Sequence, residues 1–88
     1  MKFQFDPAKA KSNRKKHGVS FADAENVFYD PFAIHQEDTF VEGEERWMGL
    51  GMGNTGRILV VVYTYRGDEL RLISVRYATG REVADYES

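Results

Sequence analysis

The chain has 88 residues, 42% hydrophobic and 30% charged, with a formal net charge of -2. This composition is ordinary for one small globular domain, expected over residues 1–88, and excludes intrinsic disorder. Because there is no cysteine, disulfides and thiolate metal sites are excluded. No apolar run approaches the ~18 residues that span a bilayer, and no signal peptide is evident. We therefore expect a cytoplasmic protein without membrane association.

The charges are segregated along the chain. Residues 1–18 hold six Lys or Arg and one Asp, whereas residues 19–45 hold eight acids and no Lys or Arg. Residues 46–81 are again basic, with six Arg against two acids, and residues 82–88 add three acids. If folding brings the two basic segments together, the protein has an anion-binding surface despite its negative net charge.

The first third of the chain predicts one strand and two helices. Residues 3–5 alternate as a short strand. Asp6 suits the N-cap of a helix over residues 7–17, which begins with proline and is followed by glycine. Ser20 suits the N-cap of a second helix, which stops before Pro31.

From residue 32 the apolar periodicity becomes two, which is typical of β-strands. Strands are expected over residues 32–36, 44–52, 57–66 and 69–77. A capping box at Thr79 then predicts a short C-terminal helix. The order β-α-α-β-β-β-β-α indicates an α+β fold, an antiparallel sheet with helices packed mainly on one face.

Simple alternation divides the side chains of the last strand between two faces. One face is expected to carry Leu70, Leu72, Ser74 and Arg76. The other face is expected to carry Arg71, Ile73, Val75 and Tyr77. The preceding strand is apolar on both faces in its middle, so we expect it to be central in the sheet and covered on both sides.

Short motifs in a fixed order run through nearly the whole chain. They are Phe5-Asp6-Pro7, Lys9-Ala10, Asn13, Lys16-His17-Gly18-Val19-Ser20-Phe21, Asp30-Pro31, Glu44-Glu45-Arg46, Gly56-Arg57, Val60-Val61-Val62-Tyr63-Thr64 with Arg66, Arg71-Leu72-Ile73-Ser74-Val75-Arg76, Ala78-Thr79, Arg81-Glu82 and Tyr86. Each motif alone is weak, but the ordered set is specific. Over about residues 3–86 it resembles the BrnT family.

The resemblance implies a fold, an activity and a partner. BrnT proteins are type II toxins that cleave RNA and arrest translation, with a fold similar to the RelE ribonucleases. They are neutralised by BrnA, a ribbon-helix-helix antitoxin, and the complex represses its own promoter. By this resemblance we expect an RNA substrate and a heterotetramer of two toxins and two BrnA-type antitoxins. DNA is expected to be contacted only through the antitoxin, and no cofactor is expected.

Metal-independent RNA cleavage needs a base for the 2′-hydroxyl proton, an acid for the leaving 5′-oxygen and cations that stabilise the phosphorane. His17 and Glu45 are the acid–base candidates, and an unperturbed histidine titrates near neutrality. Arg57 and Arg76 are the candidates for binding the scissile phosphate, since a guanidinium matches phosphate bidentately. Ordinary alternatives stay open, because His17 could cap its helix and the other three could form ion pairs in the sheet.

Lys16, Arg66, Arg81 and Trp47 are the candidates for binding the rest of the RNA. Trp47 could stack a base, although a single tryptophan in a small domain more often belongs to the core. His35 has no counterpart in the motifs and is expected at the surface. No metal-ligand cluster is evident, and the Gly-x-Gly-x-Gly run lacks the spacing of a dinucleotide-binding loop. A non-catalytic module that binds protein or RNA remains the alternative to an enzyme, and direct DNA binding is disfavoured because no helix-turn-helix is evident.

Overall fold

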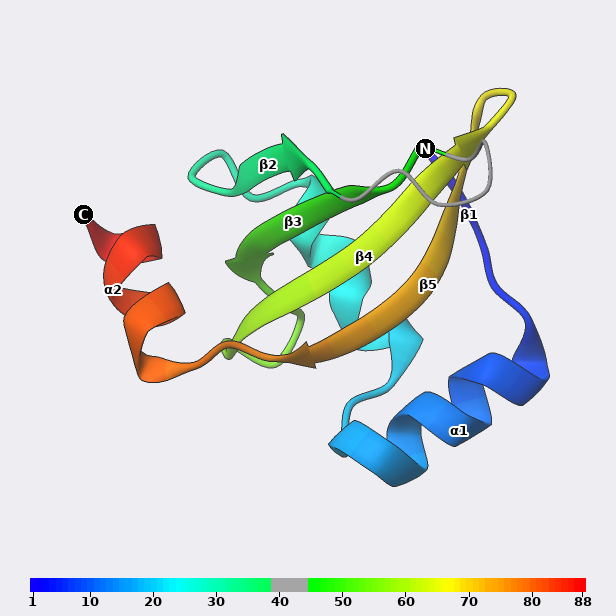
Figure 1. Ribbon diagram of the computed structural model, residues 1–88, viewed down its shortest axis with the longest axis horizontal. Helices are drawn as coiled ribbons and strands as arrows, with labels where there is room; N and C mark the ends of the chain where they lie inside the picture. The colour runs from blue at the N-terminus through cyan, green and yellow to red at the C-terminus, as the bar shows by residue number, and fades with distance from the viewer. Residues whose placement is uncertain (39–44) are drawn as a thin grey trace.

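The computed structural model describes residues 1–38 and 45–88, which form a five-stranded sheet with two α-helices and a 3₁₀ helix (Figure 1). The elements are β1 (Lys2–Gln4), α1 (Pro7–His17), η1 (Phe21–Phe28), β2 (Ile34–Glu37), β3 (Trp47–Met52), β4 (Ile58–Arg66), β5 (Glu69–Tyr77) and α2 (Gly80–Glu87). The α+β class and the order of elements are confirmed. Glu44, predicted to begin the third strand, lies outside the described residues.

The strands lie in the order β1-β5-β4-β3-β2, and neighbours are antiparallel except for β1, which runs parallel to β5. The sheet is therefore mostly antiparallel, not wholly so. Short connections join β3 to β4 and β4 to β5, which makes these pairs antiparallel. Two helices, α1 and η1, separate β1 from the other strands in the chain. No short turn therefore determines whether β1 runs parallel or antiparallel to its neighbour β5.

η1 packs on one face of the sheet and closes the hydrophobic core. The buried core side chains are Val19, Phe21, Ala24, Val27, Leu59, Val61, Tyr63, Leu70, Leu72 and Val75. Within η1 the buried residues recur every three positions, which suits the three residues per turn of a 3₁₀ helix. The sequence pattern indicated a helix here but did not distinguish this type from an α-helix.

The three helical segments occupy three different places around the sheet (Figure 1). α1 packs along β5, and α2 lies over the face opposite to η1, where Glu82 and Asp85 are close to Val60 and Leu50. We call this second face the open face. We expected the helices to pack mainly on one face of the sheet. Only η1 covers the core face, whereas α1 lies along β5 and α2 lies over the open face. α1 has almost no apolar side chains and so gains little by packing flat on the core.

The closely spaced glycines in β3 and just after it leave room for side chains of β2 and for the backbone of η1. A Cβ atom at Gly49 would lie 2.8 Å from Nδ1 of His35, and one at Gly53 would lie 2.8 Å from the carbonyl oxygen of Asp23. Both distances are too short for real Cβ contacts. The Gly-x-Gly-x-Gly run is therefore a packing surface.

Candidate functional site

A β-bulge in β5 decides which of its side chains share the open face. Val62 pairs with Ser74 and Tyr63 pairs with Leu72, so Ile73 is an extra residue on β5 with no partner on β4. A bulge of this kind shifts the alternation of side chains by one residue. The faces on the two sides of the bulge therefore cannot be read from a single alternating pattern.

The bulge corrects the face assignment made by simple alternation. The two leucines that flank Arg71 are buried in the core, and so is Val75, which stands between Ser74 and Arg76. Because neighbouring residues in a strand point to opposite faces, Arg71, Ser74 and Arg76 all point to the open face. Without the extra residue, Arg71 would lie on the face opposite to Ser74 and Arg76.

Asn13 fixes α1 beside this part of β5. Its Nδ2 donates a hydrogen bond to the carbonyl oxygen of Val75 at 2.8 Å, and its Oδ1 accepts one from the Val75 N–H at 3.1 Å. Nδ2 also lies 3.3 Å from the carbonyl oxygen of Val19. The buried amide thus takes the place of a neighbouring strand at the edge of β5, past the residues that pair with β1.

α1 brings basic side chains to the same edge. Lys9, Lys16 and His17 line a hollow of about 200 Å³ together with Ser74 of β5. Ser74 and Arg76 are two residues apart, about 7 Å along the strand, so the hollow lies next to the position of Arg76. We call Lys9, Lys16, His17, Arg71, Ser74 and Arg76 the β5 basic strip.

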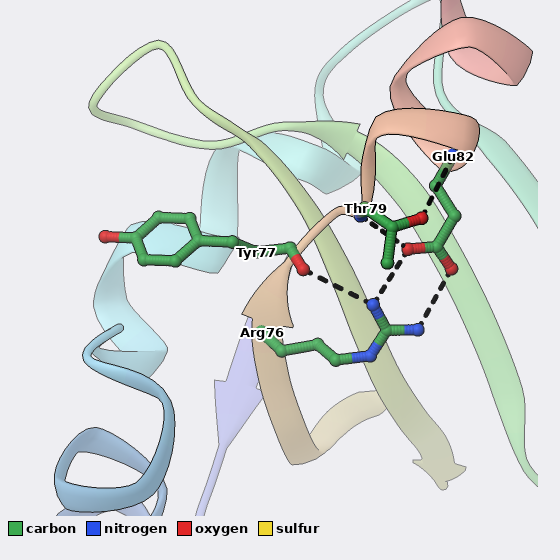
Figure 2. Close-up of polar contacts among 4 residues, drawn as sticks. All are labelled: Arg76, Tyr77, Thr79 and Glu82. Atoms are coloured by element: carbon green, nitrogen blue, oxygen red, sulfur yellow. Dashed lines mark hydrogen bonds and ion pairs between the residues drawn. The ribbon is translucent and has the colours of Figure 1, made fainter.

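Arg76 is the one member of the β5 basic strip that pairs with a carboxylate within residues 1–38 and 45–88. Its Nη1 lies 2.8 Å from Oε1 of Glu82, and its Nη2 lies 2.9 Å from Oε2 (Figure 2). These hydrogen bonds raise the pKa of Arg76 and, together with the Thr79 N–H, lower the pKa of Glu82 to about 2. Both groups are therefore charged near neutral pH.

Hydrogen bonds at both ends hold α2 over the open face. At its start, Thr79 and Glu82 form a reciprocal capping box, with the Thr79 N–H donating to Glu82 Oε1 at 2.8 Å (Figure 2). Near its end, the Tyr86 hydroxyl donates to Asp30 at 2.6 Å. The capping box orients Glu82 toward Arg76, so the pairing of Arg76 is built into the start of α2.

Two of the predicted arginines, Arg57 and Arg81, lie away from the β5 basic strip. The guanidinium carbon of Arg57 is 4.1 Å from the centre of the Tyr77 ring, and Tyr77 points away from Arg76 (Figure 2). Arg66 pairs with Glu69 in the strand register and lies diagonally across from Arg71 on the open face, next to the β5 basic strip, whereas Arg81 is exposed on α2. Arg57 and Arg76 therefore lie on opposite faces of the sheet, because Arg57 packs on Tyr77, the residue that follows Arg76 in β5.

Glu45 and Trp47 are separated from β5 by β4. The side chain of Glu45 is exposed, and its carbonyl oxygen accepts a hydrogen bond from Thr64 Oγ1 at 2.6 Å. Trp47 packs against the core and lies edge-on to Tyr65, with ring centres 6.4 Å apart. Trp47 thus takes the core position that the sequence also allowed.

His35 lies at the surface, as expected, and its ring also contacts two aromatic neighbours. Its ring stacks on Phe28 with centres 5.8 Å apart, and its Nδ1 lies 2.9 Å from the Tyr63 hydroxyl. Burial lowers the pKa of His35 and raises the pKa of Tyr63 to about 12. Because β3 and β4 lie between β2 and β5, His35 does not join the β5 basic strip.

Two of the eight predicted site residues lie with Arg76 in the β5 basic strip, namely His17 and Lys16. Lys9 and Arg71 were not among the predicted site residues. The sequence does contain a signal for Lys9, because it belongs to a helix without an apolar face. Such a helix cannot cover the core and is expected beside the sheet, with its basic side chains exposed. Arg71 could not be placed, because an apolar residue such as Ile73 gives no sign of a bulge.

Two further properties concern ligands and membranes. Among the described residues, no three His, Asp or Glu side chains come together as potential metal ligands. No helix in the part of the chain described is long and apolar enough to cross a membrane.

Comparison with known proteins agrees with the resemblance seen in the motifs. A family model described as "Ribonuclease toxin, BrnT, of type II toxin-antitoxin system" matches residues 5–82. Among solved structures, the Brucella abortus ribonuclease toxin BrnT is similar, with a TM-score of 0.69 and 30% sequence identity over 90% of this chain and 97% of that chain. Comparison with curated proteins gives no match. The chain therefore belongs to the BrnT family of ribonuclease toxins of type II toxin–antitoxin systems.

Proposed function

We propose that this protein is a metal-independent endoribonuclease that binds RNA along the β5 basic strip. The bulge at Ile73 carries the proposal, because it places Arg71, Ser74 and Arg76 on one face beside the cations of α1. Guanidinium and ammonium groups neutralise the phosphates of RNA, and a hydroxyl adds a hydrogen-bond donor. Such a row of groups suits a polyanionic chain, although the net charge of the protein is negative.

The proposed reaction is a transesterification within the RNA. A base takes the 2′-hydroxyl proton, the 2′-oxygen bonds to phosphorus, and the bond from phosphorus to the 5′-oxygen breaks as an acid protonates that oxygen. The products are a 2′,3′-cyclic phosphate and a 5′-hydroxyl. His17 is the proposed acid–base group, and Arg71 and Arg76 stabilise the negative charge of the phosphorane. Glu45, across β4 from Arg71, is proposed as the second acid–base group.

Glu82 occupies the position on Arg76 that a phosphate would take. Its two carboxylate oxygens accept from both terminal nitrogens of the guanidinium, and a phosphate presents the same pair of acceptors. RNA binding at Arg76 therefore requires exchange of Glu82 for phosphate. The same pair favours the second candidate function, a non-catalytic module that binds RNA or protein, because Arg76 is not free while Glu82 stays in place.

Family membership supports the finer biological proposals. We propose that RNA cleavage inhibits translation in the cytoplasm. A BrnA-type ribbon-helix-helix antitoxin neutralises the toxin in a complex of two toxins and two antitoxins, and DNA is contacted only through that antitoxin. Lys16 lies in the β5 basic strip and is the proposed RNA-binding residue beside His17. Arg66, diagonal to Arg71 on the open face, is proposed to extend the strip, whereas Arg81 would reach RNA only where it extends beyond it.

Incubation of the purified protein with RNA in EDTA tests the proposed function. We expect fragments that end in a 2′,3′-cyclic phosphate, and a rate lowered about 100-fold by Arg76→Ala, since removal of one group that stabilises the transition state has an effect of that size. Arg57→Ala is the control, because Arg57 lies on the other face and its removal should leave the rate unchanged.

Two results would separate the alternatives. RNA that is bound but left intact by the wild-type protein would favour the non-catalytic module. Cleavage that stops in EDTA and returns with a divalent cation would contradict metal independence, even if the products were the same.

A further inference from the structure

An apolar groove of about 310 Å³ lies between α2 and the open face of β2, β3 and β4. It adjoins the β5 basic strip at Glu82, which pairs with Arg76, and both surfaces lie on the same side of the sheet. Its floor is apolar and its wall on α2 is acidic. The residues that carry the argument are Ile34, Met48, Leu50 and Val60 on the floor and Glu82 and Asp85 on the wall.

The groove is continuous with an edge strand. β2 is the last strand in the sheet order, and all four of its residues are exposed. Within the described ranges no strand pairs with its outer edge. Ile34 belongs both to this strand and to the groove, and 43% of its surface is exposed. An unpaired strand edge beside an apolar groove is the arrangement that binds an extended segment by strand addition.

Charge limits what such a segment can be. Glu82 and Asp85 form the wall, where Glu82 already pairs with Arg76, and Glu37 and Asp38 stand at the far end of β2. Residues 19–45 contain no Lys or Arg. RNA is disfavoured by this acidic surround. A second copy of the chain would bring its own Glu37, Asp38 and Asp85 to this surface, and like charges repel. A segment with apolar side chains flanked by Lys or Arg is complementary to the groove.

We infer that this groove and the edge of β2 form the docking site for an extended, basic and apolar segment of the antitoxin. The inference rests on the proposed function only for the existence of the antitoxin and does not depend on RNA cleavage. The segment adds as a strand to β2. Side chains at alternate positions then lie beside Ile34 on the β2 side of the groove, while its cationic groups face Asp85, the carboxylate of the wall that Arg76 does not pair with.

The test measures binding of the antitoxin encoded with this toxin to the full-length toxin by titration calorimetry. Ile34→Lys blocks the apolar floor and Asp85→Lys reverses the charge of the wall. Each should weaken the Kd about tenfold or more, as expected for a change at the centre of an interface. Met52→Lys and Glu87→Lys are matched controls, because Met52 is on β3 with similar exposure and Glu87 is on α2, and neither lines the groove.

Hydrogen exchange gives a second measurement that does not depend on variants. Addition of the antitoxin should slow exchange of the backbone amides of residues 34–37. An unchanged Kd for both groove variants, or unchanged exchange in β2, would overturn the inference. So would a wild-type toxin that is dimeric alone and becomes monomeric in Asp85→Lys, because the groove would then bind a second copy. Each outcome can be read whether or not the toxin cleaves RNA.

Discussion

The guanidinium of Arg76 and the carboxylate of Glu82 face each other through two hydrogen bonds of 2.8 and 2.9 Å. Arg76 belongs to the β5 basic strip, and Glu82 belongs to the wall of the apolar groove. The pair therefore joins the surface proposed for RNA to the surface proposed for the antitoxin. Whatever changes the position of α2 also changes the availability of Arg76.

Replacement of Glu82 by Gln should strengthen RNA binding. Gln can still accept the Thr79 N–H in the capping box but no longer neutralises Arg76. One additional cation then contacts phosphate, so the slope of log Kd against log salt should steepen by about 0.7, the value per phosphate for single-stranded nucleic acid. Fluorescence anisotropy of labelled RNA over a range of salt concentrations measures both the affinity and the slope.

The control for this change is Glu87→Gln, which removes the same charge from the same helix. If both variants shift the affinity equally, the effect is one of net charge. Release of Arg76 would then not be its cause.

Acid should destabilise the protein in a pH range set by Glu82. Its pKa is about 2 in the folded protein against an ordinary value of 4.5, because the carboxylate accepts hydrogen bonds from Arg76 and the Thr79 N–H. The contribution of the ionised Glu82 to the free energy of unfolding is therefore complete above about pH 4.5, and it is lost as the pH falls toward 2. Urea unfolding at pH 6, 4 and 3 should show a steeper decline for the wild type than for Glu82→Gln. Parallel curves would mean that Glu82 does not contribute.

Replacement of Asn13 by Ala should destabilise the fold by about 2–4 kcal/mol, because it leaves the buried N–H and carbonyl oxygen of Val75 without partners. Chemical denaturation measures the change. Ser12→Ala is the control on the same helix and should change stability by less than about 0.5 kcal/mol, as exposed substitutions do. Equal effects of the two substitutions would contradict the role of Asn13 at the edge of β5.

Two glycine substitutions should have opposite signs. A methyl group at Gly53 would meet the backbone carbonyl of Asp23 at 2.8 Å, so Gly53→Ala should destabilise by about 1–3 kcal/mol, the usual result of overpacking. Gly80 is in the first turn of α2 with no atom within 4 Å of an added Cβ. Gly80→Ala should stabilise by about 0.5–1 kcal/mol, since alanine favours the helix. Thermal unfolding compares the two variants, and destabilisation by Gly80→Ala would contradict the open space around Gly80.

Local signals predicted most of the secondary structure. The N-caps Asp6, Ser20 and Thr79 are all confirmed, because each side chain accepts a backbone hydrogen bond within its own first turn. The last strand, Glu69–Tyr77, has the predicted bounds because turn residues and alternation mark both ends. Such features depend on residues close in the chain, so they can be read without the fold.

The parts that could not be predicted depend on residues far apart in the chain. The bulge at Ile73 is defined by its pairing with β4, and the parallel direction of β1 is defined by its pairing with β5. The sequence places His17 at the end of a basic helix, because that depends on neighbouring residues. It could not place His17 beside Ser74, because these two residues are far apart in the chain. Arg57 and Arg76 are equally plausible phosphate ligands in the sequence, and only the alternation of β5 in the folded sheet separates them.

The proposed function is tested most directly by single-turnover cleavage of RNA in EDTA by four variants. His17→Ala and Arg71→Ala alter the β5 basic strip, whereas Lys11→Ala and Arg57→Ala remove cations outside it. The strip variants should slow cleavage by about 10- to 100-fold, the range for loss of an acid–base or charge-stabilising group, and the other two should cleave at the wild-type rate. Cleavage that survives His17→Ala and Arg71→Ala but is lost in Arg57→Ala would place the reaction on the other face of the sheet and contradict the proposal.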